Sequence, residues 1–359
     1  MMKIDHKPVA VVLAPSIPNP RSSAGCLRLH ELLILLSSSF TVYLLLPCND
    51  SDTDNNTIRN YSVIYNCNRK KLIRLSLFIR PKLVLYEFWF VAERYYPLAK
   101  LLWSRAVHVL DCVDIEHVRR SDITGVCLDE LRGRELSMIR SFSYVLFVST
   151  NDVEYVVSLV PLTSQHYVYP VPFVGDELRE YSCDSNTLLF IGTMGHPPNK
   201  EGIEWFIGEC LPELIERNGQ IKLLVVGRGS ENLTIPENTL HNVELMGMVS
   251  DIRSEYERST IAIAPLLSGS GCNGKVVEAM GFGVPVVGTC IAAVGVGAKS
   301  NCDMKVVSDS RDMINAIIGL LDNRNELVQL RSAGLLLVEQ KFSKRVIAST
   351  VEWLVKISR

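Results

Sequence analysis

The feature that most constrains this chain is a repeated alternation of short apolar runs with longer stretches of helical spacing. The runs consist mainly of Val, Leu, Ile and Ala and lack the polar alternation of a half-exposed strand. Because both faces of such a strand must be covered, these runs are typical of a parallel sheet with helices on both sides. In the first half the predicted strands cover residues 9–14, 41–46, 83–86, 107–110 and 144–148.

The same pattern starts again in the second half, with predicted strands over 187–191, 221–226, 261–264 and 284–287. Between the halves lies the segment 169–175, which contains two prolines and a glycine and is typical of a hinge. We therefore predict an α/β protein with two doubly wound, Rossmann-like domains that face each other across a cleft. Ligands of such sheets bind beyond the carboxyl ends of the strands, which here means in that cleft.

Composition narrows the class of protein. The 359 residues are 47% hydrophobic and 21% charged, which excludes a disordered or fibrous chain. The 37 basic residues nearly balance the 39 acidic ones, so we expect no nucleic acid partner. None of the ten cysteines forms a C-x-x-C pair, and we expect reduced thiols in a cytoplasmic protein. The apolar run 9–14 is too short for a signal peptide, and polar residues interrupt the stretch 27–46, so we expect no membrane span.

Residues 264–280 carry the sharpest chemical signal. A predicted strand ends at Ala264, a loop with three glycines follows, and a helix then begins. Glycines allow the backbone to approach a ligand, and the first turn of a helix offers N–H groups to an anion. Lys275 adds a positive charge in that turn. Glu278, one turn later, could accept two hydroxyl hydrogen bonds from a ribose. The alternative is a glycine-rich turn with a capping role.

The motif GSGCNGKVVEAM over 269–280 resembles the donor-site signature of glycosyltransferase family 4, the group 1 transferases of GT-B fold. The segments 190–206, 225–229 and 247–252 resemble three further landmarks of that family, in the same order. The resemblance covers nearly the whole chain. It implies an acceptor-binding domain over 1–170, a domain binding a nucleoside-diphosphate sugar over 171–343, and a final helix, 344–359, that packs back on the first domain.

The same resemblance assigns roles to single residues. It implies that Glu278 holds the donor ribose and that the glycan or lipid-linked acceptor receives the sugar with retained anomeric configuration. Neither a cofactor nor a metal ion is expected. The remaining donor-binding residues would contact the diphosphate or the sugar: Gly192, Thr193, Arg228, Gly271, Cys272, Asn273 and Lys275.

The chain departs from the family pattern at three positions. Ser270 stands where many members have a glutamate, although one sub-branch has Gly-Ser-Gly there. That sub-branch usually has an arginine and an apolar residue before the lysine, where this chain has Asn273 and Gly274. These departures leave open a non-catalytic nucleotide-sugar-binding partner of another transferase. A nucleotide-sugar epimerase of the same fold is a further alternative, but the fuller set of acids and bases that it needs is not found.

The first domain supplies the predicted catalytic residues. The segment LDCVDIEHV over 110–118 follows a predicted strand and resembles the family's His-Asp segment, with Asp114 as the aspartate. We predict that Asp114 and His117 are catalytic; the alternative is a cap and a surface ion pair. Gly25 and Arg28 resemble a loop near the donor phosphates and the acceptor, the alternative being an exposed loop with a solvated arginine.

Six of the fourteen residues over 69–82 are basic, with apolar residues between them. This pattern favours docking to an anionic membrane surface, which suits a lipid-linked acceptor; the alternative is an ordinary amphipathic surface helix. The predicted function is therefore that of a glycosyltransferase in the synthesis of bacterial surface polysaccharide, such as capsule or lipopolysaccharide. We expect it in the cytoplasm, with peripheral contact at the inner face of the cell membrane.

Overall fold

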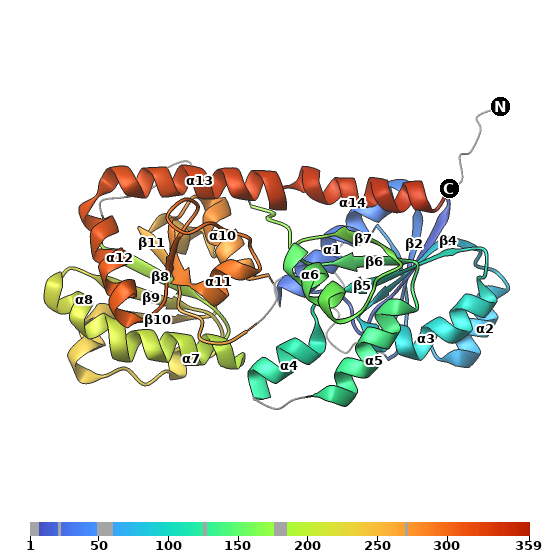
Figure 1. The fold of residues 1–359 in the computed structure, drawn as a ribbon, viewed down its shortest axis with the longest axis horizontal. Coiled ribbons are helices and arrows are strands. Elements are labelled where there is room, and N and C mark those ends of the chain that lie inside the picture. The colour runs from blue at the N-terminus through green and yellow to red at the C-terminus, as the bar shows by residue number, and fades with distance from the viewer. Residues whose placement is uncertain (1–6, 21–22, 49–59, 125–127, 176–184, 270–271) are drawn as a thin grey trace. The chain divides into compact units, whose positions relative to one another are not determined.

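The computed structural model describes residues 7–20, 23–48, 60–124, 128–175, 185–269 and 272–359. The chain forms two compact units (Figure 1). Unit 1 consists of Met1–Arg120, Cys127–Pro172 and Lys344–Arg359, and unit 2 of Ser121–Val126 and Phe173–Ser343. The change of unit after Pro172 lies within the predicted hinge segment 169–175, two residues beyond the boundary at residue 170 that the resemblance implies.

Unit 1 contains a seven-stranded parallel sheet with the order β3-β2-β1-β4-β5-β6-β7. The chain adds strands on one side of β1 and then returns to the other side, so the switch in direction falls between β1 and β4. All five strands predicted for this half are present, and the two further strands, β3 and β7, are the sheet edges. The strands are β1 (Val9–Leu13), β2 (Thr41–Leu45), β3 (Ser62–Ile64), β4 (Pro81–Glu87), β5 (Val107–Cys112), β6 (Tyr144–Phe147) and β7 (Gln165–Val168).

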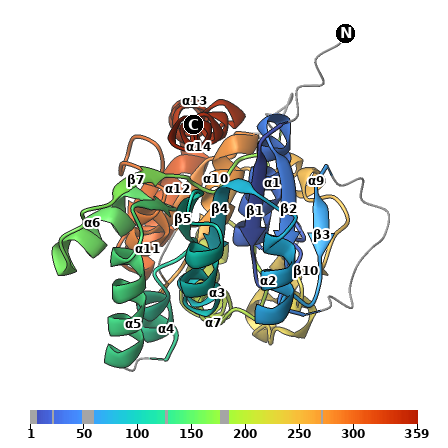
Figure 2. The same cartoon turned by 90° about the vertical axis from the view of Figure 1, so that its right-hand side faces the viewer.

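Helices cover both faces of this sheet (Figure 2). One layer contains α1 (Ala24–Ser39) and α14 (Lys344–Ile357), whose buried apolar residues share a core cluster with β1, β2 and β4. In α14 the buried residues Ile347, Val351 and Leu354 are spaced along one helix face, which explains why this last helix packs against unit 1. The other helices of the unit are α2 (Arg69–Ser76), α3 (Trp89–Leu102), α4 (Glu116–Thr124), α5 (Asp129–Arg140) and α6 (Thr150–Leu159).

Unit 2 contains a six-stranded parallel sheet with the order β10-β9-β8-β11-β12-β13. Its switch in direction falls between β8 and β11, and the crevice outside the carboxyl ends of two such strands is where open α/β sheets bind ligands. The four predicted strands are present, and β10 and β13 are again the unpredicted edges. The strands are β8 (Thr187–Ile191), β9 (Lys222–Val226), β10 (Val243–Gly247), β11 (Ile261–Ala264), β12 (Val286–Thr289) and β13 (Lys305–Val307).

The helices of unit 2 complete two apolar layers around that sheet. The helix after β8 runs without a break through a π-helical turn, Phe206–Cys210, into the next helix. Within the described part of the chain, no helix is long and apolar enough to cross a membrane. The helices are α7 (Pro197–Trp205), α8 (Leu211–Arg217), α9 (Arg253–Glu257), α10 (Gly274–Phe282), α11 (Cys290–Val294), α12 (Ser310–Asp322) and α13 (Arg324–Phe342).

Candidate functional site

The strongest candidate site lies where α10 begins, after the loop that leaves β11. The side chain of Asn273 does not cap this helix; its Nδ2 donates instead to the carbonyl oxygens of Ile291 and Ala292, at 3.1 and 3.3 Å. A helix that begins without a side-chain cap keeps N–H groups of its first turn available to an anion. Cys272 is half-buried beside it. Gly271, also predicted to bind the donor, lies outside the described residues.

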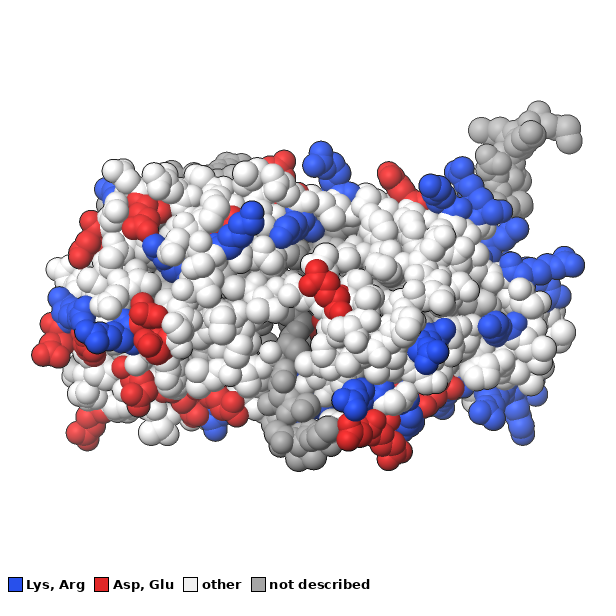
Figure 3. All heavy atoms as spheres, in the orientation of Figure 1, with Lys and Arg blue, Asp and Glu red and all other residues white. Residues whose placement is uncertain are grey.

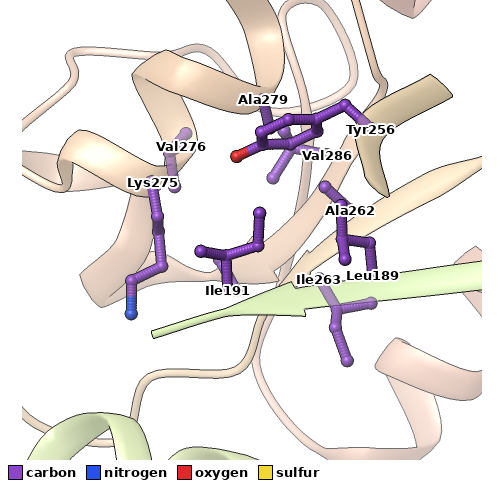
Figure 4. Close-up of a pocket in the computed structure, with 10 residues that line it drawn as sticks. Leu189, Ile191, Tyr256, Ala262, Ile263, Lys275, Val276, Ala279 and Val286 are labelled. Carbon is purple, nitrogen blue, oxygen red and sulfur yellow. The ribbon is translucent and has the colours of Figure 1, made fainter. Parts of the chain in front are cut away.

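Lys275 places a positive charge in the first turn of α10. Its ammonium group reaches the carboxyl end of β8 (Figure 4) and donates to the side-chain oxygen of Asn199. It also lies 5.1 Å from the ring centroid of Phe190. Among the described residues no carboxylate comes within 4.0 Å of Nζ, and burial lowers the pKa of Lys275 to about 8. At neutral pH this group is therefore mainly a cation without a counter-charge.

Glu278 lies one turn further along the same helix. Its Oε2 accepts a hydrogen bond from the hydroxyl of Tyr256, at 3.2 Å, and Tyr256 comes from α9 and is buried. Burial raises the pKa of Glu278 to about 7, and the hydrogen bond from Tyr256 opposes that rise. Near neutral pH a ligand that donates hydrogen bonds, such as a ribose diol, would favour the ionised carboxylate.

The loops after β8 and β9 pack backbone to backbone at the same edge of the sheet. The amide of Gly192 donates to Val226 O, and the amide of Met194 donates to Arg228 O, both at 2.9 Å. Gly227 has a φ of 132°, and a Cβ there would lie 2.1 Å from the carbonyl oxygen of Gly192. This position therefore accepts only glycine. The side chain of Arg228 is exposed.

The structure brings Gly192, Thr193 and Lys275 together through a residue that the sequence analysis did not single out, Asn199. Its Nδ2 donates to Thr193 O at 3.0 Å while its Oδ1 accepts from Lys275. A Cβ at Gly192 would lie 2.9 Å from the Asn199 amide, so this glycine makes room for that amide. Asn199 stands inside the motif over 190–206, and only its long-range partners reveal its part in the site.

In unit 1, Asp114 follows β5, and its Oδ2 lies 3.9 Å from Nε of Arg119. About a third of its side chain is exposed (32%). Burial of the rest raises the pKa of Asp114 to about 7, against the opposing effect of Arg119 and with a smaller contribution from Asp152. A carboxyl group with such a pKa exchanges protons near neutral pH, as a general acid or base must.

His117, the second predicted catalytic residue, is buried, with 5% of its surface exposed. Its Nδ1 lies 2.6 Å from Oε2 of Glu135, and its Nε2 lies 3.0 Å from the hydroxyl of Tyr155. Glu135 also accepts the backbone amides of Glu116 and His117, at 2.8 and 3.0 Å. For His117 the surface ion pair considered from the sequence is therefore wrong, because its ring and its Glu135 partner are buried. Protein groups occupy both ring nitrogens of His117, which favours a positioning role for it.

The structure corrects the prediction for Arg28. This residue is 1% exposed, and its Nη1 and Nη2 lie 2.8 and 2.7 Å from the carboxylate oxygens of Asp111, which is fully buried. Its Nε donates to Tyr169 O at 2.8 Å, and the guanidinium lies over the Tyr169 ring, 4.2 Å from its centroid. All three guanidinium nitrogens thus contact oxygens of the protein, so Arg28 is neither solvated nor placed to bind phosphate. Gly25 packs nearby, where a Cβ would lie 3.1 Å from Val113.

Comparison with known proteins adds to this geometry. Residues 185–323 match the family model described as glycosyl transferases group 1. The chain is 22% identical, over 219 residues, to an uncharacterized 44.6 kDa protein in the cps region of Klebsiella pneumoniae, covering 59% of this chain and 55% of that one. It is 29% identical, over 152 residues, to a phosphatidyl-myo-inositol mannosyltransferase of Mycolicibacterium smegmatis, covering 41% and 39%. The chain thus spans about half the length, or less, of these curated relatives.

Two solved structures match nearly the whole chain. A sucrose-phosphate synthase from Thermosynechococcus elongatus has a TM-score of 0.77 at 14% identity, covering 98% of this chain and 99% of its own. The Anabaena protein HepE in complex with UDP has a TM-score of 0.74 at 14% identity, covering 97% and 100%. The chain therefore has the two-domain GT-B fold, and its residues 185–323 resemble the group 1 glycosyl transferases.

Proposed function

We propose that this protein transfers a sugar from a nucleoside-diphosphate sugar to a glycan or lipid-linked acceptor in the synthesis of a bacterial surface polysaccharide. The observation that carries the proposal is Lys275, a cation at the start of α10, a helix that no side chain caps. No carboxylate of the described residues lies within 4.0 Å of its ammonium group. Support comes from the match to group 1 glycosyl transferases, from the relative in a cps region and from a structural neighbour that binds UDP.

In the proposed reaction the bond between the sugar C1 and the diphosphate breaks, a bond between C1 and the acceptor oxygen forms, and the proton of the acceptor hydroxyl passes to the leaving diphosphate. Lys275 and the first-turn amides of α10 would stabilise the negative charge that develops on the leaving diphosphate. Glu278 would hold the ribose, and Arg228 would add a second cation. Asp114 would accept a hydrogen bond from the acceptor hydroxyl. We infer from the resemblance that the anomeric configuration of the sugar is retained. We also propose that protein cations, without a metal ion or cofactor, neutralise the charge of the diphosphate.

The test is binding of UDP, GDP, dTDP and CMP, measured by thermal shift and then by calorimetry. A ligand that binds only the folded protein at about 100 times its Kd adds about 2.7 kcal/mol of stability. We expect one nucleotide to bind and Lys275→Met to weaken it at least tenfold. Lys222, exposed at the first residue of β9, provides the matched control Lys222→Met. Equal binding by both variants would contradict the donor-site assignment.

A non-catalytic partner of another transferase is the second candidate. The observation that favours it is the side chain of Asn273, which is bonded to two backbone carbonyls and adds no charge to the site. Such a protein would bind the nucleotide sugar but would neither hydrolyse nor transfer the sugar, whereas the transferase would release nucleoside diphosphate in the presence of acceptor.

We also propose that unit 1 contacts an anionic membrane through residues 69–82. Of these, Ile73, Leu77 and Phe78 are 47, 65 and 85% exposed. No carboxylate of the described residues lies within 4.0 Å of the cations around them. On the surface of unit 1 near α2, Lys and Arg side chains are frequent and acidic side chains are few (Figure 3). Exposed apolar side chains among unpaired cations fit the headgroup region of an anionic bilayer. The exposed cations are Arg69, Lys70, Arg74, Arg80 and Lys82.

Sedimentation with vesicles of phosphatidylglycerol and phosphatidylcholine tests this contact. Each cation near the surface contributes about 1 kcal/mol, so neutralising Arg69, Lys70 and Arg74 should weaken binding roughly a hundredfold. Phe78→Ser should weaken binding at high salt, where the apolar contribution remains. Leu240→Ser, at a residue of unit 2 that is 54% exposed, is the control. Equal binding to vesicles of phosphatidylcholine alone would contradict the proposal.

A further inference from the structure

Among the described residues, the groups that contact the ammonium group of Lys275 are electrically neutral. Its ammonium group donates to the amide oxygen of Asn199 and lies 5.1 Å from the centre of the Phe190 ring. Buried or half-buried lysines in proteins are usually paired with a carboxylate, because burial of a charge is costly. Here the chain instead holds the lysine in place with groups that carry no negative charge.

Asn199 is built to give that neutral contact. It lies in the first turn of α7 and is 9% exposed. Its amide orientation follows from its two partners: Nδ2 must donate to the carbonyl oxygen of Thr193, at 3.0 Å, and Oδ1 must accept from the ammonium group of Lys275. Both ends of the side chain are therefore used, and rotation of the amide would break both bonds.

The surroundings fix the side chain further. A Cβ at Gly192 would lie 2.9 Å from the Asn199 amide, which shows how closely the loop after β8 covers it. One turn further along α7, a Cβ at Gly202 would lie 2.3 Å from Pro265 O, so α7 is docked against the start of the loop that leads to α10. Asn199 thus connects two segments that the sheet brings to the same edge.

We propose that Asn199 is a positioning residue that fixes the Lys275 ammonium group at the donor site through a neutral oxygen and leaves its charge available to a diphosphate. This inference rests on the proposed function only for the identity of the anion. A carboxylate at position 199 would hold the lysine equally well, but it would cancel the charge that the ligand requires. An aspartate at position 199 is nearly the same size as asparagine, so it would keep the contact with Lys275 but weaken the binding of an anion.

Competitive acetylation of the full-length protein, read by mass spectrometry from pH 6.5 to 10.5, reports the titration of individual lysines. We expect Asn199→Asp to move the Lys275 midpoint upward by about 1–3 pH units, the effect of an opposite charge in contact. Asn199→Ser, which is too short to reach the ammonium group but adds no charge, should change the midpoint much less. An unchanged midpoint in Asn199→Asp would overturn the pairing.

Asn242→Asp is the matched control. Asn242 Nδ2 donates to the carbonyl oxygen of Ile221 at 2.7 Å, at the amino end of the same sheet, so this variant adds the same charge away from Lys275. It should leave the Lys275 midpoint where it is in the wild type. An equal upward shift in Asn242→Asp would show a general effect of net charge and would also overturn the pairing.

Binding of the nucleoside diphosphate found in the panel is the second measurement. We expect Asn199→Asp and Asn199→Ser both to weaken it at least tenfold at pH 7.5, for loss of charge and loss of position respectively, while Asn242→Asp binds as the wild type does. Wild-type affinity in Asn199→Ser would refute a positioning role. If the wild type binds no nucleotide, the proposed function fails, and the acetylation midpoints still decide whether Asn199 holds Lys275.

Discussion

Arg28 gives the sharpest quantitative prediction, because the structure moves it from a binding role to a structural one. Arg28→Met keeps an unbranched apolar stem and removes the guanidinium group with its charge. The change leaves the fully buried carboxylate of Asp111 without a cation and the carbonyl oxygen of Tyr169 without its donor. Breaking a buried ion pair from one side costs about 3–5 kcal/mol, because the remaining charge is uncompensated.

The neighbouring Glu87 strengthens this expectation. It is 4% exposed, and burial together with the nearby Asp111 raises its pKa well above the usual value. The neutral carboxyl form of Glu87 is therefore favoured, and Asp111 is the carboxylate that the Arg28 guanidinium contacts. With Arg28 removed, the fully buried carboxylate of Asp111 has lost the cation that its two oxygens contact, and the neighbouring acidic group offers no replacement.

The assay is thermal unfolding combined with hydrogen exchange of peptides from β1 and β5, because the two units need not unfold together. A loss of 3–5 kcal/mol in a unit of this size corresponds to a fall in Tm of roughly 6–20 °C. The double variant Arg28→Met/Asp111→Asn, which has neither charge, should recover part of the loss. Arg132→Met, at an exposed arginine paired with Asp129, should cost about 0.5 kcal/mol or less.

A structural role for Arg28 would be contradicted if Arg28→Met lost less than 1 kcal/mol in free energy of unfolding and bound nucleotide at least ten times more weakly. That combination would restore the phosphate-binding role that the sequence suggested, and it would mean that the ion pair with Asp111 opens when a ligand binds.

Three further predictions concern unit 2. Nucleotide affinity, measured by calorimetry, should be greatest between about pH 7 and pH 8, because Glu278 gains its charge above about 7 and Lys275 loses its charge above about 8; a profile without a maximum would contradict both roles. Tyr256→Phe removes the hydrogen bond that lowers the pKa of Glu278, so the acid limb of that profile should move to higher pH. Gly227→Ala should lower the free energy of unfolding by roughly 2 kcal/mol or more, because its φ is 132° and a Cβ would lie 2.1 Å from a carbonyl oxygen. Its control is Gly319→Ala in α12, where a Cβ would meet open space; this variant should raise the free energy of unfolding by about 0.5–1 kcal/mol.

The strands that the sequence did not predict are all at sheet edges. β3 and β7 close the first sheet, and β10 and β13 close the second. In β7 the first two residues, Gln165 and His166, are exposed. An edge strand is covered on fewer sides than a central one, so its sequence contains no continuous apolar run. The central strands were predictable for the opposite reason, since burial on both faces requires apolar residues at every position.

The site shows a different limit. The loop and helix around Lys275 and Glu278 form one continuous motif, and the spacing of that motif is enough to predict a candidate site there. The residues that hydrogen-bond to them lie outside this motif. Asn199 is 76 residues from Lys275 in the sequence, and Tyr256 is 22 residues from Glu278. Arg28 was misplaced for the same reason, because the partner that buries it, Tyr169, is 141 residues away. A local pattern indicates where a ligand approaches, but long-range contacts decide which side chains remain free to meet it.

Lys275 and Glu278 together suggest how the candidate site couples binding to protons. Burial shifts both groups toward their neutral forms, since it lowers the pKa of the lysine to about 8 and raises that of the glutamate to about 7. A diphosphate beside Lys275 favours the ammonium form, and ribose hydroxyls that donate to Glu278 favour the carboxylate. Binding should therefore take up a proton above pH 8 and release one below pH 7. If both proposed roles hold, only a ligand that carries an anion and a diol at this spacing offsets the cost of burying both charges. We therefore expect the site to prefer a nucleoside diphosphate to inorganic phosphate or a free sugar.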